Sequence, residues 1–221
     1  MQRLFLPAVF LVALAVGAYF ALTPSGPQTP ANPLGAANAQ EAAEVDTSSV
    51  VDMQIGNPDA PVTVIEYASF TCPHCATFHE GPFKELKANY IDTGKINFIY
   101  REVYFDQFGL WASAIARCAG PDKFFGITDM LYASQDDWRS AGDTGAIVDG
   151  MRRAGRLAGM DDETMNACLQ DNDNLRTLVA WYQQNAQADG IDSTPSFVIN
   201  GTKYSNMSYD RMAEIIDTAA E

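Results

Sequence analysis

The residues of this chain best suited to chemistry are the two cysteines at the ends of Cys72–Cys75, which reads Cys-Pro-His-Cys. Two cysteines separated by two residues form either a redox-active dithiol or half of a zinc site. Residues 62–69 are rich in β-branched and aromatic side chains, which predicts a strand, and residues 76–90 have the pattern of a helix. The cysteine pair is therefore expected where a strand turns into a helix.

A redox role needs one ionised cysteine, because the thiolate rather than the thiol attacks a disulfide. Cys72, at the start of the helix, would face free backbone N–H groups and the positive end of the helix dipole. Pro73 fits the first turn, where its missing N–H costs nothing, and the His74 imidazole would add a hydrogen bond or a positive charge. These effects stabilise the reduced form and make the disulfide a strong oxidant. We expect Cys72 to be the nucleophile and Cys75 the resolving thiol.

The zinc alternative requires more ligands than the motif supplies. His79 follows Cys75 by four residues, so Cys72, Cys75 and His79 have a ligand-like spacing. However, the chain has only two histidines and no second Cys-x2-Cys, and Cys118 would have to be the fourth ligand. We therefore favour the redox dithiol without metal or other cofactor, and expect His79 to be packed or on the surface.

Composition limits the range of partners. The 221 residues suit one domain, and 47% apolar residues are enough for a core. The 28 acidic residues exceed the 14 basic ones and give a formal charge of −14, which repels nucleic acid and anionic membrane surfaces.

The N-terminal region predicts export. Arg3 precedes an apolar run over residues 4–22, which is typical of a signal peptide or a membrane anchor. Residues 23–49 are rich in Pro, Ala and Asn and read as a flexible linker. We expect a periplasmic or other extracytoplasmic location, with residues 4–22 either cleaved or tethering the domain to the inner membrane. Disulfides persist in such compartments.

The folded part is expected to be a sheet covered by helices. Strands are predicted at residues 50–55, 62–69, 95–104, 196–199 and 202–204. The strand–helix–strand order after residue 62 implies a parallel, right-handed crossover, with a kink in its helix at Gly81-Pro82. Five helices are predicted between residues 107 and 189, with Asp143 and Asp161 as N-caps, and Ser208 begins a last one.

These features together resemble the DsbA-like family of thioredoxin-fold thiol:disulfide oxidoreductases. The resemblance rests on the Cys-Pro-His-Cys motif, Glu66 six residues before it, the helical insertion, and Thr194-Pro195 before a strand and the Asn200-Gly201 hairpin signal. It covers roughly residues 50–221. It implies an α/β thioredoxin fold, a central mixed sheet flanked by helices, with an all-helical subdomain inserted at about residues 106–189.

The resemblance also implies roles near the dithiol. Glu66 would be a partly buried acid that exchanges protons with Cys75; the alternative is an outward-facing residue on an edge strand. Pro195 would be cis and face the dithiol, with the Thr194 backbone pairing with substrate; the alternative is a proline that marks an edge strand. In the family, Pro-His between the cysteines accompanies strong oxidants, whereas Thr194 departs from the Val-Pro found in many of them.

The other two cysteines fall in the predicted insertion. With export expected, Cys118 and Cys168 are interpreted as a structural disulfide; the alternative is two small buried thiols. Such a pair is not a core feature of the family.

Three functions remain in competition. The favoured one is a monomeric oxidase that donates its disulfide to unfolded exported proteins and is reoxidised by a membrane quinone-linked oxidase. Its substrate surface would be apolar, with Phe70, Trp111 and the Gly190–Thr194 loop as candidates. The alternatives are a disulfide isomerase or reductase of the same fold, and a non-catalytic binding module.

Overall fold

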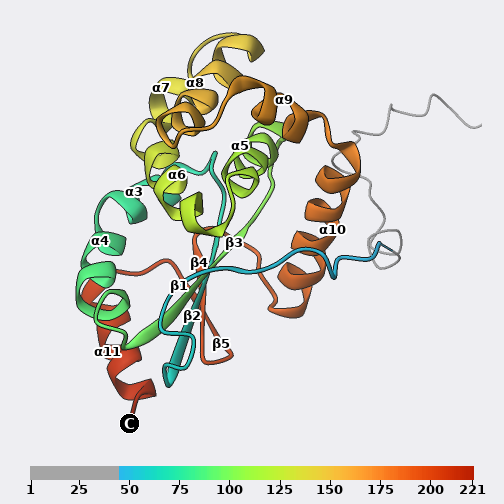
Figure 1. Cartoon of the computed structure of the whole chain (residues 1–221). Helices are drawn as coiled ribbons and strands as arrows, with labels where there is room; N and C mark the ends of the chain where they lie inside the picture. The colour runs from blue at the N-terminus through green and yellow to red at the C-terminus, as the bar shows by residue number, and fades with distance from the viewer. Residues whose placement is uncertain (1–44) are drawn as a thin grey trace, which may run out of the picture. The chain divides into compact units, whose positions relative to one another are not determined.

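The computed structural model describes residues 45–221 of the chain (Figure 1). The apolar segment 4–22 and most of the expected linker 23–49 lie outside the described residues. Thr47, near the end of that linker, donates a hydrogen bond from its hydroxyl to Gln184, so ordered contacts begin before residue 50. No helix within residues 45–221 is long and apolar enough to cross a membrane.

The centre of the fold is a mixed sheet of five strands in the order β1-β3-β2-β4-β5. β2 and β3 are parallel, as predicted, and the other three pairs are antiparallel. β2 therefore lies inside the sheet, between β3 and β4. The strands are β1 (Met53–Gly56), β2 (Val62–Ala68), β3 (Ile96–Glu102), β4 (Ser196–Ile199) and β5 (Thr202–Ser205).

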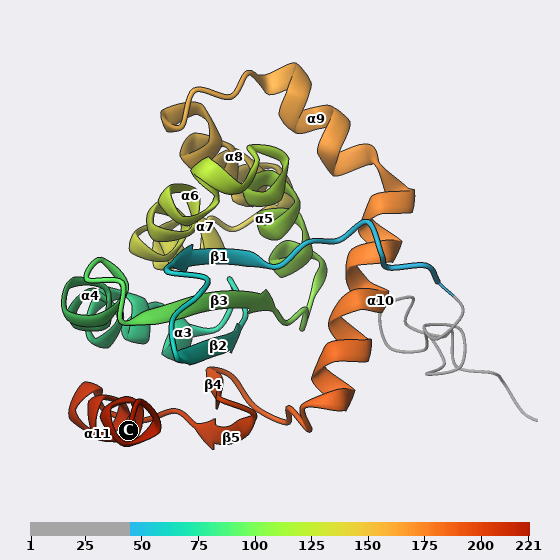
Figure 2. The same cartoon turned by 60° about the horizontal axis from the view of Figure 1, so that its bottom comes forward.

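Helices cover both faces of the sheet. In Figure 2, α4 (Pro82–Leu86) and α11 (Tyr209–Ala219) lie on one side of the strands and α10 (Asn172–Ala188) lies on the other. Successive side chains of a strand point to opposite faces. On β2, Tyr67 packs with Ala186 of α10, whereas Val64 belongs to the core on the opposite face.

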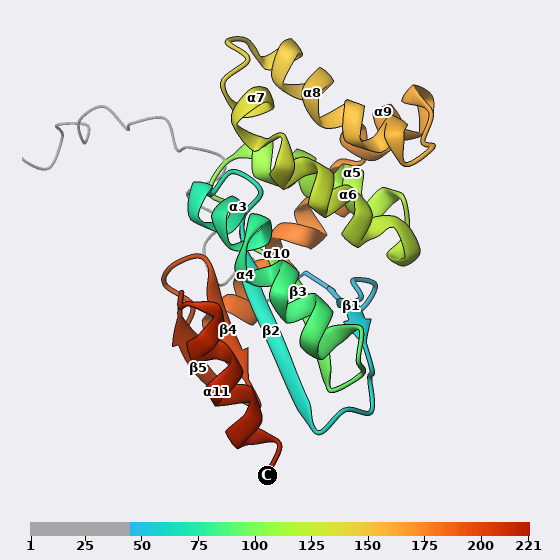
Figure 3. The same cartoon turned by 90° about the vertical axis from the view of Figure 1, so that its left-hand side faces the viewer.

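The helix after the cysteines is interrupted as expected at Gly81. α3 (Pro73–Glu80) ends there, and α4 begins with Pro82, which has no N–H to continue the hydrogen-bond ladder. A π-helical turn, Lys87–Ile91, follows α4. Figure 3 shows α3 and α4 running beside β2 and β3.

Six helices, rather than the five predicted, lie between β3 and β4. The additional one is α7 (Gln135–Arg139), too short to show a helical period in the sequence. Asp143 and Asp161 are N-caps as predicted, each accepting a hydrogen bond from a backbone N–H of the first turn. The other helices are α5 (Gln107–Cys118), α6 (Pro121–Ala133), α8 (Thr144–Leu157), α9 (Asp162–Gln170) and α10.

The Asn-Gly hairpin and the last helix also follow the prediction. Asn200 and Gly201 have φ values of 44° and 83°, and the type I′ turn that joins β4 to β5 requires positive φ at both positions. The Ser208 hydroxyl accepts a hydrogen bond from the N–H of Arg211 and begins α11.

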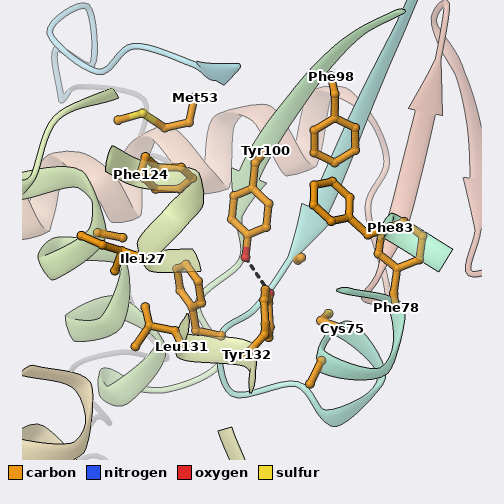
Figure 4. Close-up of a cluster of buried hydrophobic side chains, with 14 of the residues drawn as sticks. Met53, Cys75, Phe78, Phe83, Phe98, Tyr100, Phe124, Ile127, Leu131 and Tyr132 are labelled. Atoms are coloured by element: carbon orange, nitrogen blue, oxygen red, sulfur yellow. Dashed lines mark hydrogen bonds between the residues drawn. The ribbon is translucent and has the colours of Figure 1, made fainter. Parts of the chain in front are cut away.

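Aromatic side chains fill the core between the sheet, α3–α4 and α6 (Figure 4). The hydroxyls of Tyr100 and Tyr132 hydrogen-bond to each other over 2.6 Å. Phe83 lies 5.1 Å from Phe98, ring centre to ring centre. The part of the core that lies under the cysteine motif is therefore closely packed and mostly apolar.

Cys118 of α5 and Cys168 of α9 form a disulfide, with their Cα atoms 6.3 Å apart. The bond ties together two helices of the region between β3 and β4, and Cys72 and Cys75 remain the free thiols.

Candidate active site

The two free cysteines occupy different environments at the start of α3. Cys72 is the N-cap, with φ −85° and ψ 117°, and Pro73 follows at the first turn as predicted. Cys75 lies one turn further and has no exposed surface, whereas Cys72 keeps 7% of its surface exposed. Only Cys72 can therefore meet another protein's sulfur directly.

The surroundings of the Cys72 sulfur favour its thiolate. A hydrogen bond from the Cys75 thiol contributes most, and burial opposes it; the Thr194 side chain and the backbone N–H groups of Cys75 and His74 add further hydrogen bonds. Together they lower the pKa of Cys72 to about 5. The contribution of His74 comes through its backbone N–H, and the role predicted for its exposed imidazole stays a prediction.

This lowered pKa predicts a pH-dependent stability of the reduced protein. Cys72 has a pKa of about 5 in the fold, against an ordinary value of 9.0. Between these values the unfolded chain binds one more proton at Cys72, so the free energy of unfolding rises with pH. Cys75 stays protonated in both states below about pH 8 and adds nothing there.

We therefore expect the reduced protein to gain thermal stability relative to the disulfide form as the pH rises from about 5 to about 8. The gain should vanish as the pH falls through about 5. Thermal unfolding of both redox forms across this range measures the effect. A difference that does not vary with pH would contradict it.

Cys75 is held as a neutral thiol. Burial raises its pKa far above the ordinary range, and its hydrogen bond to Cys72 and the negative charges of Glu66 and Cys72 raise it further. Its sulfur is therefore reactive only after a base removes its proton.

Glu66 points from β2 toward α3 and has no exposed surface. Its Oε2 lies 2.9 Å from Nε2 of His79, and its Oε1 has no hydrogen-bond partner among residues 45–221. The alternative of an outward-facing edge residue is wrong, because β2 is an interior strand. A proton-exchange role for Glu66 stays a prediction.

His79 is packed in the core, with 3% of its surface exposed. Its ring stacks on Tyr132 at 4.4 Å and lies 4.5 Å from Phe83, between ring centres. A packed His79 was one of the two positions expected from the sequence, but its pairing with Glu66 was not predicted. The sequence did contain a signal for this pairing. The alternation of side chains along the strand turns Glu66 inward, and His79, four residues after Cys75, lies on the same face of the helix as Cys75.

Thr194-Pro195 lies across the site from α3. The peptide bond between them is cis, as expected. The Cys72 thiol can donate to the Thr194 carbonyl, with 3.6 Å between sulfur and oxygen. Pro195 leads into β4, which lies between β2 and β5, so the interpretation of an edge strand is wrong.

Comparison with known proteins identifies the family of this chain. A family model described as Thioredoxin matches residues 48–218. The chain belongs to the thioredoxin family.

Within the thioredoxin family, the similar proteins are named for disulfide chemistry. A Rickettsia bellii protein with the provisional name protein-disulfide oxidoreductase is 37% identical over 171 residues, which are 77% of this chain and 65% of that protein. Disulfide bond formation protein D of Bacillus subtilis is 26% identical over 74% of each chain. The chain thus spans 60–65% of the length of the rickettsial relatives it matches.

Solved structures show the same fold with a helical insertion. Alpha-DsbA1 of Wolbachia pipientis has a TM-score of 0.70 and 28% identity, over 76% of this chain and 90% of that one. Oxidised BdbD of Bacillus subtilis has a TM-score of 0.67 and 23% identity, over 76% and 92%. The chain is therefore a DsbA-like member of the thioredoxin family, with the mixed sheet and inserted helices that the resemblance implied.

Gln135 is a residue of this thioredoxin-family site that the sequence analysis missed. It is buried on α7, and its Nε2 donates to the carbonyl oxygens of Phe70 (2.7 Å) and Cys72 (3.0 Å). Gln135 thus holds in place the backbone of the loop that joins β2 to Cys72 at the start of α3. The signal was weak, because α7 is short and lies 63 residues away in the chain.

Phe70 is not part of an apolar surface, which corrects the sequence-based expectation. It is 1% exposed and packs against Tyr100 and Tyr132. Trp111 is half-buried and residues 192–193 are exposed. In the part of the chain that the structure describes, no cluster of three or more potential metal ligands occurs.

Proposed function

We propose that this protein is an exported thiol:disulfide oxidoreductase that introduces disulfide bonds into other proteins through Cys72 and Cys75. The observation that carries the proposal is the asymmetry of the pair: the Cys72 thiolate is stabilised and Cys75 is a buried thiol. A stabilised thiolate lowers the free energy of the reduced form, so the disulfide form is a strong oxidant. The names of the relatives and neighbours support the same chemistry.

The reaction begins when a substrate thiolate attacks Cys72 Sγ, the accessible sulfur. A substrate–Cys72 disulfide forms, the Cys72–Cys75 bond breaks, and Cys75 leaves as a thiolate that takes up a proton. A second substrate thiolate then attacks the substrate sulfur of the mixed disulfide, and Cys72 leaves as its stabilised thiolate. The substrate gains a disulfide and loses two electrons, and the dithiol gains them.

Reoxidation then requires an electron acceptor outside the chain. We propose a membrane quinone-linked oxidase as that acceptor and unfolded exported proteins with free cysteines as substrates, with the chain acting as a monomer without other cofactors. Export through residues 4–22 would place it in the periplasm or an equivalent compartment, where disulfides persist.

The reduction potential of Cys72–Cys75 tests the direction of the reaction. Equilibration with glutathione, followed by alkylation and peptide-resolved mass spectrometry, separates this pair from Cys118–Cys168. We expect a potential close to the value of about −120 mV typical of strong oxidants, rather than the value of about −270 mV of thioredoxin. A potential near the latter would reject the oxidase, and refolding of a scrambled substrate would then measure isomerase activity.

A further inference from the structure

The proposed reaction moves one proton to or from Cys75 in each half-reaction. When the disulfide is reduced, Cys75 leaves as a thiolate and gains a proton; when it re-forms, Cys75 must lose that proton to attack. Yet Cys75 has no exposed surface. Because an isolated charge is costly to bury, the proton needs a path through the protein.

Glu66 is placed to exchange that proton. Its negative charge acts on the Cys75 thiol, and its Oε1 is fully buried without a hydrogen-bond partner in residues 45–221. A carboxylate oxygen that lacks a donor in an apolar core can accept a proton from a nearby thiol. Glu66 itself has no exposed surface, so it cannot pass the proton directly to solvent.

His79 continues the path away from Cys75. Its Nε2 contacts Glu66 Oε2 at 2.9 Å, and within the described chain its buried Nδ1 also lacks a partner. His79 lines a cavity of about 300 Å³ together with Lys84, Asp129 and Met130 among others. One nitrogen of the His79 ring thus contacts the Glu66 carboxylate, and the ring lies at the wall of a cavity.

The neighbouring aromatic groups hold this ring but do not compete for the proton. Tyr132 and Phe83 pack against the imidazole, and Figure 4 shows the Tyr132 ring next to Tyr100 and near Cys75. Burial raises the pKa of both phenols well above the ordinary range, so they stay protonated at neutral pH.

The charged groups of the cavity come from α3, α4, the π-helical turn and α6. They are Glu80, Lys84, Lys87 and Asp129. Burial raises the pKa of Asp129, against the opposing charges of His79, Lys87 and Lys84. Asp129 is therefore the group best suited to exchange protons with the outer end of the path.

We propose that Glu66 and His79 form a proton relay that connects the buried Cys75 thiol with the cavity between α3, α4 and α6. This proposal rests on the proposed function, because it describes a step of thiol–disulfide exchange. It adds His79, which the sequence analysis treated only as a packed or surface residue or a zinc ligand. Glu66 and His79 share one proton in the disulfide form.

In the reductive half-reaction, the shared proton passes from Nε2 of His79 through the Glu66 carboxylate to the Cys75 thiolate. One proton from the cavity arrives at Nδ1 as Nε2 loses its own, so the carboxylate ends as it began. Re-formation of the disulfide reverses every transfer: the Cys75 proton moves to Glu66, then to Nε2, and the proton on Nδ1 leaves. The two half-reactions together restore the original tautomer, so the ring does not have to flip in its tightly packed site.

The substitution His79→Gln tests the relay, because its amide can still donate a hydrogen bond to Glu66 but does not carry a proton. Reduced protein is mixed with oxidised glutathione and quenched in acid at set times, and mass spectrometry follows the Cys72–glutathione mixed disulfide. We expect the rate at which Cys72 forms this mixed disulfide to be the same in His79→Gln as in the unaltered protein. Its resolution by Cys75 should slow on the order of a hundredfold, the typical effect of general acid–base catalysis, so the adduct accumulates.

Matched variants separate a relay from mere packing. Glu80→Gln removes an exposed carboxylate beside His79 at the same cavity and should resolve the adduct at the normal rate. Glu66→Gln should slow resolution as His79→Gln does, and the double variant should be no slower than the slower single variant, because both groups serve one path. Free imidazole should speed resolution in His79→Ala by refilling the vacated site.

The outcomes distinguish the relay from the proposed function. If the unaltered protein forms no mixed disulfide, the proposed function fails. If it does, and folded His79→Gln resolves the adduct at the normal rate, the relay is overturned. Should neither His79 variant fold, the rate of resolution in the unaltered protein is measured in mixtures of light and heavy water. If the relay operates, a plot of this rate against deuterium content should be curved, because two protons move together. A straight line would overturn the relay.

Discussion

Replacing Cys75 by serine is expected to abolish turnover and to trap the protein on its substrates. Cys72 keeps its N-cap position and its backbone N–H donors, so it still attacks substrate disulfides as a thiolate. Without the resolving sulfur the mixed disulfide cannot be released by the protein itself. Rates of oxidation of a dithiol peptide should therefore fall by at least about a thousandfold, as expected when a covalent catalyst loses its partner group.

The adducts provide the measurement for this prediction. Cys75→Ser should show bands of higher mass that disappear on reduction, and peptide mapping should place every one of them at Cys72. Cys72→Ser is the matched control and should form none. Adducts in the control, or normal turnover of Cys75→Ser, would show that the chemistry lies elsewhere.

Replacing Arg117 by alanine is expected to destabilise the fold by about 3–5 kcal/mol, the typical cost of leaving a buried charge without its partner. Glu102, at the end of β3, is 1% exposed. Its two carboxylate oxygens accept hydrogen bonds from Arg117 Nε and Nη2, each at 2.6 Å. The Ser113 hydroxyl donates a further one at 2.9 Å. Removing the guanidinium leaves the carboxylate with this single neutral donor.

Chemical denaturation measures this loss, and a second ion pair serves as the control. Arg211 and Glu214 form an ion pair at 2.9 Å, but both side chains are more than 60% exposed. Arg211→Ala should therefore cost less than about 1 kcal/mol. Equal losses in both variants would mean that Glu102 does not depend on Arg117.

The parts of the fold that the sequence predicted correctly are those set by local interactions. Asp143 and Asp161 cap helices through N–H groups three residues away, and Asn200-Gly201 makes its turn through its own backbone. The cysteine motif also carries its chemistry locally, because Cys72 and Cys75 belong to one helical turn. Such features depend on few residues, so no other part of the chain has to be placed first.

The sequence by itself thus determined the position of the cysteine pair at the start of a helix, the compositional class, and the order of the strands and of the helices other than α7. It did not determine which buried polar groups meet. Periodicity indicates which face of an element is buried, but the partner depends on how distant elements pack. Glu66 and His79 come from β2 and α3, Gln135 reaches Cys72 across 63 residues, and Thr194 reaches it across 122. Only the tertiary structure brings these groups to the dithiol, because the sheet and the inserted helices must close around α3 before any of them is within hydrogen-bond reach.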